Sequence, residues 1–429
     1  MSIKIKSTEC VKKDAISRLS TNTLSNTKRI HRWGNFIAGF SIEFVELCLS
    51  NVSCKPDTGL ILDPFAGCGT TLIGAKNLGF STVGYELHPI FHAISSGKLQ
   101  HYNSENVDQI LNTFQKKSVP FLWSNDAAKF LSKLFSDENL AFISSVINNL
   151  DKIPSNLRDI SITMFLKACE MSCSAQTDGI YKAPTSTKTH IPLNIALERV
   201  ASDFLDDIGS DWYQNHWIYT PPSRIIRQSS LNMEIVKPNT VDCCVTSPPY
   251  LNNFDYAEMT RMHLYLLGWC NSWKNISENV RNHLITNTTT ALNGKKLPIY
   301  QDEACKLIPH VIHEELSYLV NRLAVERKIR AGKKEYDYLI YPYYSQITQV
   351  LKNIFFALRL RGEIHWVIAD AALYGIHIET HKHIALIMKE IGFQNIKINF
   401  LRKRGHRWHL SKRDGAEKGL GEYHIEAIK

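Results

Sequence analysis

Residues 246–250, with the sequence Thr-Ser-Pro-Pro-Tyr, place a hydroxyl, two prolines and an aromatic ring directly after an apolar run at residues 241–245. That run predicts a buried strand, and two successive prolines cannot continue its hydrogen-bond ladder. The last carbonyl groups and the Ser247 hydroxyl therefore remain as acceptors beside Tyr250. Carbonyls and a hydroxyl can hold the hydrogens of a planar amine while the tyrosine lies against the attached ring. An exocyclic amine of cytosine or adenine fits this arrangement.

A glycine-rich turn stands between an earlier strand and a helix. Residues 59–62 predict a buried strand, residues 63–71 the turn, and residues 72–78 the helix. In a doubly wound α/β fold, such glycines allow close approach of the backbone to a ligand, and the helix N-terminus offers free amides. Glu86 closes the next strand, residues 81–85, where an acid accepts hydrogen bonds from ribose hydroxyls. We expect a ligand on this turn.

The remaining chain alternates strands and helices, which predicts an α/β fold. Further strands are expected at residues 224–226, 363–369, 394–400 and 422–428. Helices are expected at residues 256–269, 314–328, 344–358 and 380–391. The third strand is delayed because helical periodicity fills much of the intervening chain, notably at residues 127–135, 140–150 and 158–173.

These patterns divide the chain into an α/β domain and its additions. Residues 1–30 are polar and basic and predict an arm, either on phosphates or in solvent. Residues 31–96 and 223–429 form the α/β domain, and residues 97–222 a mainly helical insertion. Residues 270–335 form a second insertion of loop and helix, and long loops of this kind are often functional.

The composition is that of a globular protein with an anionic partner. Of 429 residues, 44% are hydrophobic, and the formal net charge is +9, with basic clusters at residues 4–32 and 402–413. No window approaches the roughly 18 apolar residues of a membrane span, and the N-terminus lacks the apolar core of a signal peptide. We expect a cytoplasmic protein. The ten cysteines, including the adjacent Cys243 and Cys244, do not suggest a disulfide framework and are read as reduced thiols.

The residues 63–70, Glu86 and residues 246–250 together resemble the S-adenosylmethionine-dependent DNA amino-methyltransferases. The serine form of the proline motif is most similar to the cytosine-N4 branch. Residues 33–36 resemble the family's cofactor-flanking motif, and residues 344–429 its last helices and strands. The resemblance implies a Rossmann-like, class I methyltransferase fold with a seven-stranded, mostly parallel sheet, and S-adenosylmethionine as the cofactor.

The resemblance also implies a role for each site residue. The glycine turn would wrap the methionine part of the cofactor, Glu86 would hold the ribose, and residues 33–36 would close over it. Where the family usually has an acid near the adenine, this chain has Gln228 and Ser229. The cofactor-binding residues are then Trp33, Asn35, Phe36, Asp63, Pro64, Phe65, Ala66, Gly67, Cys68, Gly69, Thr70, Thr71, Glu86, Gln228 and Ser229.

Catalysis is expected at the proline motif. The Ser247 hydroxyl and a neighbouring carbonyl would accept the two amine hydrogens, and Tyr250 would stack on the base. The catalytic residues are Ser247, Pro248, Pro249 and Tyr250. Since such a base is buried in a duplex, it must be flipped out. A basic and aromatic tract suits the DNA, although a solvated loop is an equal alternative: Arg402, Lys403, Arg404, Arg407, Trp408, Lys412 and Arg413.

We therefore predict a site-specific methyltransferase for the N4 amine of cytosine in double-stranded DNA. It would be the modification enzyme of a restriction-modification system, with a cognate endonuclease that acts on the same site. The glycine turn precedes the proline motif, so target recognition must come from an insertion or the C-terminal end; residues 97–222 and 270–335 are both candidates. The alternatives are an adenine-N6 enzyme, an RNA guanosine-N2 enzyme and an inactive DNA-binding subunit.

Two other chemistries are disfavoured. A carbon-5 cytosine methyltransferase needs a cysteine after the strand, whereas Cys243 and Cys244 lie within it. The histidine groups lack cysteine partners and the HExxH pattern, so no metal site is predicted from His310, His313, His377, His381 and His383.

Overall fold

A seven-stranded sheet forms the centre of the computed structural model, with the strand order β10-β11-β7-β6-β1-β2-β5. The structure describes residues 21, 27–34, 39–50, 52–178, 181–252, 255–287, 306–329, 335–404 and 420–429. The strands are β1 (Leu60–Asp63), β2 (Ser81–Tyr85), β5 (Ser223–Ile226), β6 (Val241–Thr246), β7 (Leu358–Ala369), β10 (Gln394–Arg404) and β11 (Leu420–Ile428).

The sheet is parallel except for β11, which runs antiparallel to both of its neighbours, β7 and β10. The pairings β5–β2, β2–β1, β1–β6 and β6–β7 are all parallel. The predicted seven-stranded, mostly parallel sheet is therefore confirmed. Because β1 and β6 are adjacent and parallel, the turns that follow them emerge at the same edge of the sheet.

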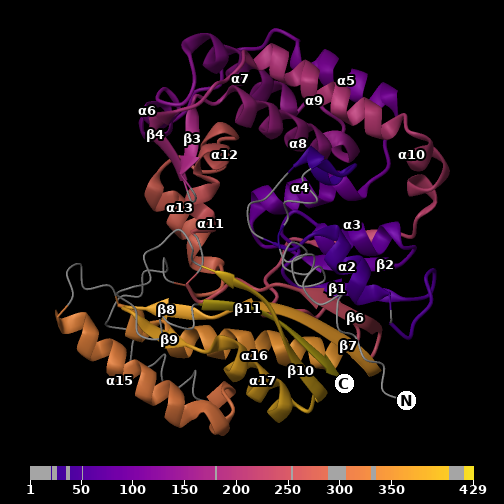
Figure 1. Ribbon diagram of the computed structural model, residues 1–429. Helices are drawn as coiled ribbons and strands as arrows, with labels where there is room; N and C mark the ends of the chain where they lie inside the picture. Colours follow the sequence, from indigo (N-terminus) through magenta and orange to yellow (C-terminus); the bar gives the residue numbers. More distant parts are fainter. Residues whose placement is uncertain are drawn as a thin grey trace, which may run out of the picture.

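Helices cover both faces of this sheet (Figure 1). On one face, α2 (Ile42–Leu49) and α3 (Thr70–Asn77) pack on alternate strand residues such as Ile61 and Cys243. On the other face, α16 (Ile340–Ala357) and α17 (Thr380–Ile391) pack on Leu62, Cys244 and Trp366. This two-residue alternation is what a strand buried on both faces requires, and it explains why these strands read as continuous apolar runs.

Between β2 and β5 the chain forms a helical lobe (Figure 1). Its elements are α4 (Pro89–Leu99), α5 (Ser104–Phe114), α6 (Asn125–Leu131), α7 (Asp137–Leu150), α8 (Ser155–Ser172), β3 (Ala175–Asp178), β4 (Tyr181–Thr187), α9 (Leu193–Ile208), α10 (Asp211–Asn215) and η3 (Trp217–Tyr219). The three helices predicted from periodicity are present as α6, α7 and α8. The run after them forms an antiparallel hairpin, β3–β4, which the sequence pattern did not predict.

The segment after β6 joins the sheet to this lobe. It was predicted as one helix over residues 256–269, which was wrong, because the chain forms α11 (Tyr256–Met259) and α12 (Arg261–Leu266). They meet at Thr260, whose hydroxyl contacts His88 Nε2 at 2.9 Å and donates to the Tyr256 carbonyl at 2.8 Å. Such a side-chain bond to the preceding turn competes with the helix. The apolar residues of α12 pack into the core of the lobe.

The remaining elements follow in two groups. After α12 come α13 (Trp273–Asn279) and η4 (Arg281–His283), then η6 (His310–Ile312), α15 (His313–Ile329) and η7 (Tyr336–Tyr338). A small hairpin of β8 (Ala371–Leu373) and β9 (Ile376–Ile378) stands between β7 and α17. Among the helices that the structure describes, none has the length and apolarity needed to cross a membrane.

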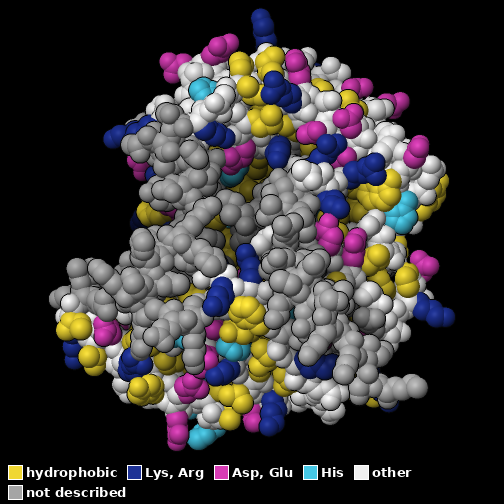
Figure 2. Space-filling model, in the orientation of Figure 1, with side chains coloured by type: hydrophobic (Ala, Val, Ile, Leu, Met, Phe, Trp, Pro, Cys, Tyr) yellow, Lys and Arg dark blue, Asp and Glu magenta, His cyan; other side chains and the backbone are white. Residues whose placement is uncertain are grey.

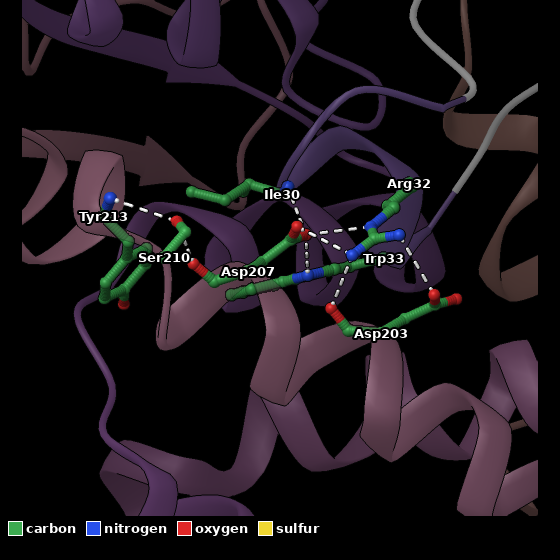
Figure 3. Close-up of polar contacts among 7 residues, drawn as sticks. All are labelled: Ile30, Arg32, Trp33, Asp203, Asp207, Ser210 and Tyr213. Carbon is green, nitrogen blue, oxygen red and sulfur yellow. Dashed lines mark hydrogen bonds and ion pairs between the residues drawn. The ribbon is translucent and has the colours of Figure 1, made fainter.

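The N-terminal segment around η2 (His31–Trp33) is fixed to α9 by one buried carboxylate (Figure 3). Asp207 is 1% exposed and accepts hydrogen bonds from the Ile30 amide at 2.9 Å and the Trp33 indole at 2.8 Å. It also pairs with the Arg32 guanidinium at 2.8 Å. The Trp33 ring stacks on Phe204 with a centroid distance of 4.3 Å. This segment is therefore attached to the helical lobe.

Candidate active site

A cavity of about 500 Å³ lies where β1, β2 and β6 end, the usual ligand position in an open α/β sheet. Residues from separate parts of the chain meet in its walls. The predicted site residues among them are Asp63, Pro64, Phe65, Ala66, Gly67, Cys68, Thr70, Glu86, Gln228, Ser229, Ser247, Pro248, Pro249, Tyr250, Arg402 and Arg404. The glycine turn (residues 63–71) and the acceptor turn (residues 246–250) therefore share one cavity.

The conformation of the glycine turn explains its composition. Gly67 and Gly69 have φ angles of +51° and +85°, in the left-handed region that residues with a Cβ rarely adopt. Gly69 then caps α3. A Cβ placed on Gly67 would meet no atom within 4 Å, so a side chain there would extend into open space beside the cavity. At Gly67 the turn therefore presents its backbone, without a side chain, to the cavity.

A direct hydrogen bond joins the two turns. The Thr246 hydroxyl donates to Asp63 Oδ1 at 2.6 Å, and the same oxygen accepts from the Phe65 amide at 2.9 Å. Burial raises the pKa of Asp63 to about 6, against the lowering effect of these hydrogen bonds. Asp63 thereby fixes the start of the glycine turn and its distance from the acceptor turn.

Glu86 holds the glycine turn from the other side. Its carboxylate accepts from the Gly67 amide at 2.8 Å and from the His88 amide at 2.7 Å. Burial raises its pKa to about 7. Since each carboxylate oxygen has further lone pairs, Glu86 can still accept hydrogen bonds from a ligand in the cavity.

The aromatic end of the cavity has its own support. The Tyr250 hydroxyl donates to Glu422 Oε1 at 3.1 Å and lies 3.3 Å from the Ser247 hydroxyl. Glu422 is 3% exposed and accepts from Arg402 Nε at 2.6 Å. The Arg404 guanidinium lies over the Tyr250 ring, 5.0 Å from its centroid. Burial raises the pKa of Tyr250 well above its usual value, so its hydroxyl stays protonated and donates.

Three residues predicted to bind the cofactor are not among the wall residues of the cavity. Trp33 has its ring stacked on Phe204, and its indole donates to Asp207. Thr71 is fully buried, and its hydroxyl donates to the Val245 carbonyl at 3.1 Å, which ties α3 to β6. Gly69 lies at the helix cap and is not among the wall residues of the cavity. Asn35 and Phe36 lie outside the described residues.

The predicted DNA contacts divide in a similar way. Arg402 and Arg404 lie in the cavity wall, where they contact Glu422 and Tyr250, and Lys403 between them is exposed. The remaining four predicted residues lie outside the described part of the chain: Arg407, Trp408, Lys412 and Arg413.

Sequence reasoning missed several residues that shape the cavity. His31, Phe40, His88 and Glu422 line it, and none belongs to a recognised motif. His88 Nδ1 accepts from the Ile90 amide, and burial lowers the pKa of His88 to about 3, so the imidazole stays neutral. The only sequence signal for His88 was its position two residues after Glu86.

Lys98 connects the N-terminal segment to the glycine turn. Its ammonium is fully buried and donates to the carbonyls of Gly34 and of Cys68, the latter at 3.1 Å. Burial lowers the pKa of Lys98 to about 8. The glycine turn is therefore held by Asp63, by Glu86 and by this buried amine.

Comparison with known proteins decides the family. A profile of the N6/N4 DNA methylase family, described as DNA methylase, matches residues 7–96, which contain the glycine turn and Glu86. The match supports a DNA amino-methyltransferase.

Relatives extend this similarity along most of the methyltransferase. It is 25% identical over 437 residues to the type II methyltransferase M.BsoBI of Geobacillus stearothermophilus, covering 90% of this chain and 83% of the relative. It is 23% identical over 416 residues to M.AvaI of Nostoc sp., with the same coverage. It is also 21% identical over 434 residues to M.MvaI of Kocuria varians, covering 95% of this chain and 90% of the relative.

The cofactor of this methyltransferase is S-adenosylmethionine, and the residues of the cavity fit it. The donor set suits a nucleoside with an amino-acid tail, since an acid stands at the end of β2 and bare backbone at the glycine turn. Glu86 has oxygens for ribose hydroxyls, and Gly67 leaves open the space that a side chain would take. The predicted fold, family and cofactor are thus confirmed.

Replacing Lys98 by methionine is expected to weaken S-adenosylmethionine binding about tenfold. The change keeps the apolar stem but leaves the carbonyls of Gly34 and Cys68 without their donor. The glycine turn is then less well fixed, and the free energy of cofactor binding should weaken by about 1.4 kcal/mol. Isothermal titration calorimetry would measure the affinity. Lys76→Met is the matched control, because Lys76 is equally buried but donates to the Pro221 carbonyl, away from the cavity. Equal weakening in both variants would contradict the role of Lys98.

The affinity for S-adenosylmethionine is expected to rise about tenfold between roughly pH 6 and pH 8, because Glu86 ionises with a pKa of about 7. Only the carboxylate accepts from both ribose hydroxyls. The folding stability of the protein without cofactor should depend on pH in the opposite direction. The native pKa lies above the unfolded value, so the contribution of Glu86 to stability is present at low pH and is lost as the pH rises through about 7. Glu86→Gln should flatten both profiles; an unchanged pH dependence of binding would reject this assignment.

Proposed function

We propose that this methyltransferase transfers the methyl group to the exocyclic N4 amine of a cytosine flipped out of double-stranded DNA. The observation that carries the proposal is the Thr246–Asp63 hydrogen bond. It fixes the acceptor turn against the glycine turn at the wall of one cavity. Methyl transfer needs an amine and an electrophile held in line at close range, and a rigid connection between their two binding turns provides this.

The acceptor turn prepares the amine for reaction. The lone pair of a nucleobase amine is delocalised into the ring, and the Ser247 hydroxyl and the carbonyl of Ser247 or Pro248 accept its two hydrogens. They thereby draw the nitrogen toward a tetrahedral geometry. S-adenosylmethionine, when bound, supplies an electrophilic methyl group on a sulfonium. As the nitrogen gains that methyl it becomes cationic, and it then loses one of its protons to solvent water. The Pro249 carbonyl is occupied by the Tyr343 hydroxyl at 3.3 Å, which keeps the turn in place.

The face of Tyr250 receives the base. The Arg404 guanidinium lies over this ring, and a stacked base would take its position. Arg404 then moves toward the DNA backbone, where it serves as a phosphate contact. The aromatic face also stabilises the positive charge that develops on the amine. Glu422 and Arg402 keep the ring in a fixed orientation throughout.

The wider DNA interface is also part of the proposal. The helical lobe within residues 97–222 and the insertion at residues 270–335 are the two candidates for target recognition. Lys403 is exposed beside the cavity residues and suits a phosphate, as does the tract at residues 407–413. The curated relatives are type II methyltransferases. We therefore propose a cytoplasmic modification enzyme of a restriction-modification system, with a cognate endonuclease that acts on the same site.

Mass spectrometry of DNA nucleosides from cells that express the protein tests the reaction. We expect N4-methylcytosine in the DNA of these cells and much less of it in cells that express Ser247→Ala. N6-methyladenine without N4-methylcytosine would replace the proposed target by adenine, since the same acceptor geometry serves both amines. Methyl transfer to transfer RNA but not to duplex DNA would reject the DNA target. Methylation-sensitive sequencing of the same genome gives the recognition sequence.

A further inference from the structure

A buried thiol and two buried imidazoles meet on the face of the sheet covered by α2. Cys48 comes from α2, His365 from β7 and His424 from β11, and their exposed fractions are 6%, 7% and 8%. One ligand atom of each residue lies within 4.8 Å of the other two. Among the residues that the structure describes, this is the group of histidine, cysteine and acidic side chains close enough to hold a metal ion.

The two imidazoles are oriented as metal ligands usually are. His365 Nδ1 and His424 Nε2 face each other at 3.0 Å, and the rings are stacked with centroids 5.1 Å apart. The outer nitrogens face carboxylates: His365 Nε2 lies 3.7 Å from Glu363, and His424 Nδ1 lies 3.5 Å from Glu426. A metal-bound histidine typically has its other nitrogen directed at a carboxylate, which fixes the tautomer and strengthens the ligand.

The cluster is incompletely satisfied without an ion. Two facing nitrogens can share only one proton, and His365 Nε2 has no partner within hydrogen-bond distance among the described residues. Buried polar atoms in this state are uncommon and call for a bound group. The Phe44 ring stands edge-on to His424 at 5.1 Å, so apolar surface closes one side of the cluster.

We propose that Cys48, His365 and His424 bind a zinc ion. One thiolate and two neutral imidazoles are a ligand set that zinc prefers over magnesium or calcium, which select oxygen. The ion takes the place of the proton shared between the facing nitrogens. That proton moves to the outer nitrogen of its own ring, so both imidazoles stay neutral, and the Cys48 thiol releases its proton to solvent on binding. A water molecule completes the tetrahedron, because the described part of the chain offers three ligands here.

The position of the ion gives it a structural role. It joins α2 to the two strands that support the aromatic end of the cavity. Val367 on β7 and Glu422 on β11 line the cavity, each two residues from a zinc ligand on the same strand. The side chains at these positions point to the same face. Zinc therefore stabilises the sheet edge behind the acceptor turn and takes no part in methyl transfer.

Metal analysis of the full-length protein tests the proposal. The purified protein should contain about one zinc per chain, and the metal-free protein should regain it in competition with a chromophoric chelator. Reconstitution with cobalt should give a sulfur-to-cobalt charge-transfer band in the near ultraviolet, which reports the Cys48 thiolate directly. Failure of the wild-type protein to bind zinc, or a cobalt spectrum without that band, would overturn the proposal whatever the methyltransferase activity.

Variants assign the ligands. Cys48→Ser should weaken zinc binding about 100-fold or more, and Glu426→Gln about tenfold through the imidazole that it faces. Cys270→Ser is the matched control, since Cys270 is a buried free thiol in the core of the helical lobe. Circular dichroism checks the fold of each variant. Unchanged zinc affinity in Cys48→Ser, or equal loss in Cys48→Ser and Cys270→Ser, would overturn the assignment; the cobalt spectrum of the wild type remains decisive if a variant does not fold.

Discussion

Replacing Tyr250 by alanine is expected to lower the rate of methyl transfer about 10- to 100-fold while S-adenosylmethionine affinity stays within about twofold. The aromatic face is expected to contribute about 1–3 kcal/mol of stacking to the flipped base, and each 1.4 kcal/mol is a factor of about ten in rate. The Tyr250 hydroxyl is held by Glu422 on β11, whereas Glu86 and Lys98 hold the glycine turn. Single-turnover methyl transfer to duplex DNA and calorimetric titration of the cofactor would measure the two quantities separately.

Tyr250→Phe is the control for this prediction. It keeps the ring and removes only the hydroxyl that donates to Glu422 at 3.1 Å, so a loss of about fivefold is expected, corresponding to one hydrogen bond of about 1 kcal/mol. Ser247→Ala should behave like Tyr250→Ala, because it removes an amine acceptor and leaves the glycine turn intact. Equal losses of turnover and cofactor affinity in either alanine variant would mean that the acceptor site lies elsewhere.

The sequence was sufficient for the parts of the site that depend on local conformation. Gly67 and Glu86 could be assigned because a strand-turn-helix unit needs glycine at left-handed positions and places the acid at the end of the next strand. The prolines after Thr246 likewise mark the end of a strand whatever surrounds them. Local rules of this kind do not depend on distant residues, so they can be read without a structure.

The parts that the sequence did not predict depend on contacts between distant residues. Trp33 was assigned to the cofactor by its neighbours in the chain, but Asp207 and Phe204 draw its ring into the helical lobe. Glu422 gave no signal because its partner Tyr250 is 172 positions away. Cys48 and the two histidines beside it belong to α2, β7 and β11, and only the sheet order brings them together. In each case the partners are distant in the sequence, and only the fold shows that they are neighbours.

The helical lobe therefore contributes to the cofactor site through the N-terminal segment. Asp207 on α9 fixes Ile30, Arg32 and Trp33 (Figure 3), and the next residue, Gly34, gives its carbonyl to Lys98. His31, in the middle of this segment, lies in the cavity wall. Charged and apolar side chains are interspersed on the outer surface of the lobe (Figure 2). Asp207, by contrast, is buried. A substitution of Asp207 should therefore displace His31 and weaken cofactor binding.

Replacing Asp207 by alanine is expected to lower the free energy of unfolding by about 3 kcal/mol, because it leaves the Ile30 amide and the Trp33 indole without their acceptor and removes the buried partner of Arg32. It should also weaken S-adenosylmethionine binding, since His31 loses its fixed position. Urea unfolding and calorimetric titration would measure both effects. Asp203→Ala is the matched control. Asp203 pairs with the same Arg32 at 3.0 Å, but its side chain is 49% exposed, so its loss should cost less than about 1 kcal/mol and leave cofactor binding unchanged. If the two variants were equally destabilised, the stabilisation would come from the surface ion pair, and the proposed route from α9 through the N-terminal segment to the cofactor cavity would be wrong.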